Sequence, residues 1–219
     1  NLASKYLGWG NCSGNIDSDK FIPFGSYYRA GVPIAEPANG SVLVILPQIP
    51  RMIRALSCFW NGIDREEKLL RWQKSIEHLK NVPNIKFRCK SCDEKTYSKW
   101  IKDLITADIN EGDRFASYET IIVMYPSTAI IEGLSRCKKI ILHFELNDII
   151  LTEESFTEYQ RLIENEVLID DPEKVVDKLN SKETADCNEE WVSSFLDKYG
   201  RKINPCESTE RLLQLIRSL

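Results

Sequence analysis

The chain has 219 residues, of which 42% are hydrophobic and 28% charged, a balance typical of a globular protein rather than a disordered one. Its formal net charge of -4 argues against nonspecific nucleic-acid binding, which depends on a basic surface, so we expect no nucleic-acid partner. No segment approaches the roughly 20 consecutive apolar residues that a membrane-spanning helix needs.

The cysteine count and the first residues bear on the cellular context. Seven cysteines are an odd number, which fits free thiols in a reducing compartment better than a disulfide framework, so we expect a cytoplasmic protein. The chain starts at Asn1 with neither an initiator Met nor a signal-peptide pattern, so we expect it to be a piece of a longer polypeptide.

Apolar runs of strand length alternate with amphipathic segments along most of the chain. Residues 5–10 and 20–25 are expected to form short strands, and residues 31–40 a linker rich in Pro and Gly. Further strands are expected at residues 41–47, 85–89, 120–125, 139–144 and 167–169, and helices at 64–80, 97–105, 127–137, 153–165, 171–179, 189–199 and 208–219.

This alternation predicts parallel βαβ units with right-handed crossovers, and therefore an α/β fold with a parallel sheet flanked by helices. We expect three parts: inter-domain strands and a linker over residues 1–40, a nucleotide-binding domain over 41–188, and carboxyl-terminal helices over 189–219 that pack on it.

The clearest local signal follows the strand expected at residues 120–125, in the sequence Tyr125-Pro126-Ser127-Thr128. Ser127 or Thr128 would cap a helix at the carboxyl end of a buried strand, where hydroxyls and free backbone N–H groups can hold a phosphate. Glu132 comes one helical turn later, where its carboxylate could accept hydrogen bonds from ribose hydroxyls. The alternative is a plain helix cap with a solvated Glu132, which spacing alone does not exclude.

Arginines near strand ends are further candidates for anion binding. Gln48 and Arg51 follow the strand at residues 41–47, and Arg54 comes three residues after Arg51, although a surface pair of arginines fits equally well. Arg88 stands late in a buried strand and needs a partner, for which a phosphate or a structural acid such as Asp93 would serve.

Two other features are candidates for ligand contact. The turn Gly8-Trp9-Gly10 could admit a ligand close to the backbone with Trp9 as a stacking platform, although core packing of Trp9 is the alternative. His143 follows an apolar strand, at the strand end where ligands sit in open α/β sheets.

The sequence lacks the motifs of several common nucleotide-binding, catalytic and metal-binding sites. No Walker A motif, GxGxxG fingerprint or GxSxG elbow occurs. Cys89 and Cys92 form a CxxC, but no second pair of ligands accompanies them, so we expect no metal and no cofactor.

Several motifs, taken in order, resemble the carboxyl-terminal, donor-binding half of bacterial surface-carbohydrate transferases with the GT-B architecture of two Rossmann domains. They are the Gly8-Trp9-Gly10 turn before the strand at 20–23, the stretch from Val44 to Arg51, residues 85–88, Tyr125-Pro126-Ser127-Thr128 with Glu132-Gly133-Leu134, and Glu190-Trp191 with residues 195–199.

The resemblance implies a Rossmann-like domain of a glycosyltransferase that acts in surface polysaccharide synthesis and binds a nucleotide-activated sugar, with CMP as one candidate nucleotide. It assigns phosphate contact to Ser127 and Thr128, ribose contact to Glu132, and further donor contacts to Arg88 and Arg51. Gln48 stands where the family pattern has Glu, so no catalytic role is carried over to it.

The resemblance also implies an amino-terminal acceptor-binding domain outside this sequence, with any membrane contact made only through the acceptor. The catalytic residues stay unknown, and the fragment is expected to be inactive alone. Two alternatives stay open: a polyol-phosphate transferase domain that uses a CDP-glycerol-like donor, and a noncatalytic binding domain of the same fold.

Overall fold

The computed structural model describes part of the chain. The described residues are 6–8, 21–23, 38–49, 65–89, 93–101, 104–106, 115–136, 139–148, 153–181, 192 and 195–196. Within these residues, no helix combines the length and the apolar composition that crossing a membrane requires.

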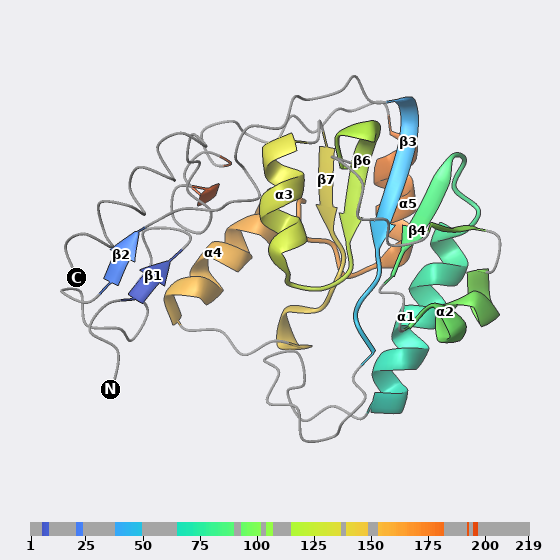
Figure 1. The fold of residues 1–219 in the computed structure, drawn as a ribbon, viewed down its shortest axis with the longest axis horizontal. Coiled ribbons are helices and arrows are strands. Elements are labelled where there is room, and N and C mark those ends of the chain that lie inside the picture. The colour runs from blue at the N-terminus through green and yellow to red at the C-terminus, as the bar shows by residue number, and fades with distance from the viewer. Residues whose placement is uncertain are drawn as a thin grey trace, which may run out of the picture.

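A parallel five-stranded sheet is the centre of the described structure (Figure 1). Its order is β5-β4-β3-β6-β7, with every neighbouring pair parallel. Relative to the order of the chain, the strands stand as 3-2-1-4-5, the arrangement of the Rossmann-type doubly wound fold. The strands are β3 (Ala38–Ile45), β4 (Ile85–Arg88), β5 (Ile105–Thr106), β6 (Tyr118–Val123) and β7 (Lys139–Leu142).

Both faces of this sheet are buried, which explains why the central strands are continuous apolar runs. Successive side chains point to opposite faces, so Val42 and Val44 join one core cluster while Leu43 and Ile45 join another.

Helices cover each face. One cluster includes residues of α1 (Arg65–Leu79), α2 (Glu94–Ile101) and α5 (Pro172–Asn180), and the other includes residues of α3 (Thr128–Arg136) and α4 (Glu153–Glu164). Two short 3-10 helices, η4 (Phe115–Ser117) and η5 (Leu146–Asp148), complete the described helices.

Two short strands near the amino terminus, β1 (Tyr6–Gly8) and β2 (Phe21–Pro23), pair in parallel as a separate two-stranded sheet. Both were expected from the sequence. In the expected carboxyl-terminal helices, only Val192, Phe195 and Leu196 are described, and all three are helical.

Three expected element bounds are wrong. The linker expected at residues 31–40 ends before Ala38, because β3 already begins there and pairs with Tyr118. The helix expected at 97–105 is α2, which begins at Glu94 and ends at Ile101, while Ile105 belongs to β5. The strand expected at 167–169 is limited to one parallel bridge between Leu168 and Leu142.

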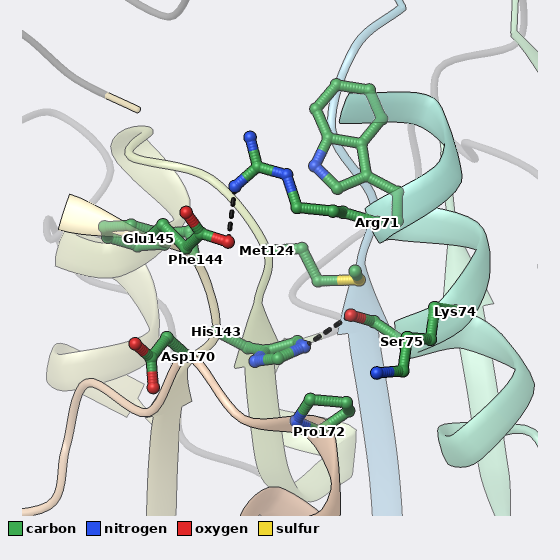
Figure 2. Close-up of a pocket in the computed structure, with 10 residues that line it drawn as sticks. Arg71, Lys74, Ser75, Met124, His143, Phe144, Glu145, Asp170 and Pro172 are labelled. Atoms are coloured by element: carbon green, nitrogen blue, oxygen red, sulfur yellow. Dashed lines mark hydrogen bonds and ion pairs between the residues drawn. The ribbon is translucent and has the colours of Figure 1, made fainter. Parts of the chain in front are cut away.

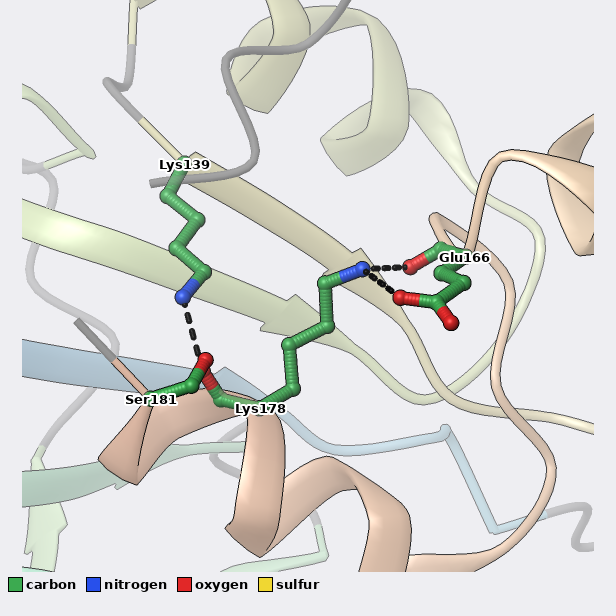
Figure 3. Close-up of polar contacts among 4 residues, drawn as sticks. All are labelled: Lys139, Glu166, Lys178 and Ser181. Carbon is green, nitrogen blue, oxygen red and sulfur yellow. Dashed lines mark hydrogen bonds and ion pairs between the residues drawn. The ribbon is translucent and has the colours of Figure 1, made fainter. Parts of the chain in front are cut away.

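Polar contacts hold the carboxyl end of α5 against the rest of the fold (Figure 3). Lys178 Nζ donates to the carbonyl oxygen of Glu166 at 2.6 Å and lies 3.2 Å from its carboxylate. Glu166 has a positive φ of 52°, a conformation uncommon outside glycine. Lys139 Nζ donates to the Lys178 carbonyl at 2.9 Å, which places a cation at the negative end of the helix dipole.

Two polar side chains, from Tyr97 and Asp93, form hydrogen bonds with the backbone of the segment that follows β3. The buried Tyr97 hydroxyl donates to the Pro47 carbonyl at 2.8 Å, and the Ile49 N–H donates to the Asp93 carboxylate at 3.1 Å. Burial, reinforced by the nearby Asp93 charge, raises the pKa of Tyr97, so its phenol stays protonated and able to donate. Gln48, between the two anchored residues, is exposed.

We expect Tyr97→Phe to lower the free energy of unfolding by about 1 to 3 kcal/mol, because the buried Pro47 carbonyl loses its donor. Urea denaturation measures this change. Ser98→Ala is the matched control on the same helix, since the Ser98 hydroxyl contacts only an exposed carbonyl of its own turn. Equal stability losses in the two variants would contradict the role assigned to Tyr97.

Candidate functional site

The parallel register brings most of the expected site residues to one edge of the sheet. Arg88 pairs with Ile45, Ile45 pairs with Val123, and Val123 pairs with Leu142, so the four strands end in one row. Arg88 ends β4, Gln48 and Ser127 follow β3 and β6, and His143 directly follows β7.

The centre of this row is the switch point of the fold. From β3 the chain moves to β4 and β5 on one side, and it then returns to β6 on the other side of β3. Open α/β sheets bind ligands where the strand order reverses in this way, outside the carboxyl ends of the strands. Here the carboxyl ends of β3 and β6 flank that position.

A corner formed by Tyr125, Pro126 and Ser127 connects β6 to α3, and all three residues are half-buried. Ser127 caps the helix, because its Oγ accepts from the Ala129 N–H at 3.3 Å and its carbonyl from the Ile130 N–H at 3.0 Å. The cap uses the lone pairs of Oγ, so the hydroxyl proton can still donate to a ligand.

Thr128 is the first residue of α3 and is half-buried. The positive end of the helix dipole therefore lies beside Ser127 and Thr128. Glu132 also belongs to α3, but its side chain lies outside the described residues.

Gly133 lets α3 pack closely on the sheet beside this corner. A Cβ at Gly133 would lie 2.7 Å from Cδ1 of the buried Ile140 on β7 and 3.9 Å from Cβ of Ile121 on β6. A larger side chain would have to push the helix or Ile140 away. Gly133 thus helps to set where the first turn of α3 stands relative to β6.

Arg88 is half-buried, and its guanidinium lies over the Phe115 ring, 5.6 Å from the ring centroid. This contact is a cation–π arrangement. Asp93, the structural acid suggested by the sequence, accepts from the Ile49 N–H.

His143 is buried, with 4% of its surface exposed, and both of its ring nitrogens are hydrogen-bonded. Nδ1 lies 2.8 Å from the Ile169 carbonyl oxygen and Nε2 lies 2.8 Å from Ser75 Oγ on α1 (Figure 2). A carbonyl can only accept, so Nδ1 carries the proton, and in the neutral ring Nε2 accepts from the Ser75 hydroxyl. Burial lowers the pKa of His143, which favours this neutral form.

His143 and Ser75 line a pocket of about 150 Å³, which lies between α1 and the segments that follow β7 and Leu168. Arg71 of α1 forms an ion pair with Glu145 at its rim (Figure 2). The sequence analysis missed Arg71, Ser75 and Glu145. A polar residue at position 75 beside the inward-facing Ile76 was the available signal, but it does not reveal which strand the helix faces.

Four expected residues, Trp9, Gly10, Arg51 and Arg54, lie outside the described residues, and Gly8 ends β1. In the described part of the chain, no group of three or more His, Cys, Asp or Glu side chains is arranged to hold a metal ion.

Comparisons with known proteins identify the fold. No protein-family model matches the chain, and no curated protein matches it. Among solved structures, it is similar to a variant of the wall teichoic acid polymerase TagF, with a TM-score of 0.52 at 12% sequence identity. The match covers 98% of this chain and 57% of the TagF chain. At this identity the likeness shows the fold alone, and it confirms the expected Rossmann-like α/β class.

We expect the free energy of unfolding to fall as the pH drops below about 6.5, because burial of His143 lowers its folded pKa below the usual 6.5. The unfolded chain then binds more protons than the folded one, which favours unfolding as acid is added. His143→Gln should remove this component, reducing the slope by up to about 1.4 kcal/mol per pH unit.

Urea denaturation between about pH 7.5 and 5.5 measures the slope in each protein. His78→Gln is the matched control, since it changes the other histidine, leaves both hydrogen bonds of His143 in place and removes only a minor electrostatic influence on the pKa of His143. A His143→Gln protein that keeps the wild-type slope would contradict the prediction.

Proposed function

We propose that this chain is the donor-binding domain of a bacterial glycosyltransferase that acts in the synthesis of a surface polysaccharide such as capsule or O-antigen. In this proposal it binds a nucleotide-activated sugar, with CMP as one candidate nucleotide. The observation that carries the proposal is the corner of Tyr125, Pro126 and Ser127, which stands at the switch point and is followed by Thr128 in the first turn of α3.

Phosphate binding is the first role of this corner. The N–H groups of the first helical turn and the helix dipole favour an anion there, and the two hydroxyls of Ser127 and Thr128 add donors. Glu132, one turn along the same helix, is proposed to accept from the ribose hydroxyls. Arg88 at the end of β4 and Arg51 beyond β3 are proposed to supply positive charge.

Stabilisation of a leaving group is the second role. In sugar transfer, the bond between the anomeric carbon and a phosphate oxygen breaks, and its electron pair stays on the phosphate. Fixed donors aimed at that oxygen stabilise the developing charge. The acceptor and its activating base are assigned to a separate acceptor-binding domain, so this chain alone should bind nucleotide and catalyse no transfer.

A polyol-phosphate transferase is the second candidate, and the fold likeness to a wall teichoic acid polymerase favours it. Such an enzyme moves a phosphorus atom from the donor into the product, whereas sugar transfer leaves all phosphorus on the nucleotide. Phosphorus NMR of the product of the complete enzyme therefore separates the two. A phosphodiester in the product would support the second candidate and contradict the first.

We expect the chain to bind CMP, UDP or GDP in isothermal titration, and Ser127→Ala combined with Thr128→Ala to weaken that binding at least about a hundredfold. Two hydrogen bonds to a charged phosphate are lost, each worth about 1.5 to 3 kcal/mol. Ser98→Ala with Thr157→Ala is the matched control, because these hydroxyls contact exposed carbonyls of their own helices.

Loss of the helix cap must be separated from loss of a ligand contact. Ser127→Asp caps a helix as well as serine does, but it sets a negative charge against the phosphate. This variant should unfold like the wild type and bind no nucleotide. If none of the three nucleotides binds, or if the alanine pair binds like the wild type, a noncatalytic domain is the better description.

A further inference from the structure

The pocket beside His143 is separate from the corner at α3, although both stand at the carboxyl edge of the sheet. We call it the α1–β7 pocket. Met124 lines it from the end of β6 and joins the core cluster on the α1 side of the sheet, whereas Ala129, near the start of α3, joins the opposite cluster. Ser127 follows Met124 by only three residues. The pocket and the corner thus adjoin the end of the same strand from opposite faces.

Among the described residues that line the α1–β7 pocket, the charges balance. Arg71 and Lys74 contribute two positive charges, and Glu145 and Asp170 contribute two negative charges. The Arg71–Glu145 ion pair already neutralises one charge of each sign (Figure 2). His143, which forms part of the lining, is held in its neutral tautomer by the Ile169 carbonyl and Ser75. A lining with no net charge gives a phosphate dianion no electrostatic advantage over a neutral ligand.

The volume of the pocket limits the size of the ligand that it can hold. Pockets for drug-sized ligands measure roughly 300 to 1,000 Å³, whereas this one measures about 150 Å³. It therefore fits a group of about one ring and is too small for a nucleotide. A complete nucleotide would extend beyond it.

The lining of the pocket combines apolar side chains with hydrogen-bond acceptors. Trp72, Met124 and Phe144 offer apolar surface, while the carboxylates of Glu145 and Asp170 can accept several hydrogen bonds each. The Ser75 hydroxyl donates its proton to His143, so toward a ligand it can act only as a hydrogen-bond acceptor. Acceptors beside apolar surface suit a polyhydroxylated ligand, whose hydroxyls donate while its C–H faces pack on apolar groups.

We propose that the α1–β7 pocket binds one neutral sugar or polyol unit of the substrate. The inference deepens the proposed function and rests on it for the identity of the reaction. The same chemistry has two sources, the unit being transferred from the donor or the end unit of the acceptor.

The direct test is NMR titration of the chain with glucose, galactose, N-acetylglucosamine and glycerol at millimolar concentrations, with inorganic phosphate as the charged counter-probe. At least one neutral compound should shift the signals of Ser75, His143 and Trp72, and phosphate should not. Pocket signals that move for none of the neutral compounds, or move more for phosphate, would overturn the proposal.

Asp170→Asn is the decisive variant, because Asp170 is exposed and its loss should leave the fold intact. It removes a charged acceptor and makes the lining net positive. The affinity for the neutral compound should fall about tenfold, as expected for one hydrogen bond to a charged group, while phosphate should bind more tightly. Asp177→Asn, an exposed acid on α5 outside the pocket, is the matched control and should change neither. Equal effects of the two variants would overturn the proposal.

The source of the unit is settled by competition in the same titration. A nucleotide-sugar that displaces the neutral compound identifies the pocket as the place of the transferred unit, and simultaneous binding of both identifies it as the place of the acceptor. Failure of nucleotide binding at Ser127 would leave the response to free sugars unchanged. The two proposals therefore fail in distinguishable ways.

Discussion

The parallel pairing of β3 with β6 is the constraint on which the other features depend. Both strands are covered on both faces, so the side chains from Val42 to Ile45 and from Ile121 to Val123 are buried in the core. Polar groups can only be placed where the strands end. Because parallel strands end at the same edge, the hydroxyl corner, the exposed Gln48, Arg88 and His143 all emerge there.

The two faces of the sheet create different environments at that edge. On the α3 side, a helix begins at the end of β6 and presents its positive end beside Ser127 and Thr128. On the α1 side, the middle of a helix lies over the edge, so side chains rather than free backbone groups line the space. The first arrangement suits an anion and the second a neutral polar group, which is the division that the two proposals require.

The local environment of His143 illustrates how a buried polar group is tolerated here. Its two hydrogen bonds satisfy the ring, and one of them is donated to the carbonyl of Ile169, the residue after Leu168, which forms the bridge with β7. The other comes from α1, so the histidine connects the sheet to the helix that borders the pocket. A change of its protonation state would therefore act on the packing of α1 as well as on the pocket.

Much of the architecture could be predicted from the residues, and the errors have local causes. The apolar runs of β3, β6 and β7 are long enough to be recognised as buried strands, and Asp171 with Pro172 marks the start of α5, where the Asp171 side chain accepts from the Glu173 N–H. The start of α2 was missed because its first turn is polar and shows no apolar periodicity. The early start of β3 at Ala38 depends on its pairing with Tyr118, and the Gly40 N–H contacts Glu119, 79 residues away.

The α/β class, the helix that begins after β6 and its cap at Ser127 or Thr128 could be read from the sequence, because short-range patterns of polarity and capping specify each of them. The meeting of His143 with Ser75, which are 68 residues apart, and of Arg71 with Glu145 was decided only by tertiary structure. Those contacts depend on how α1 is rotated against β7 across the sheet. Periodicity tells which side of a helix faces inward, but the opposing residue is set by the packing of the complete core.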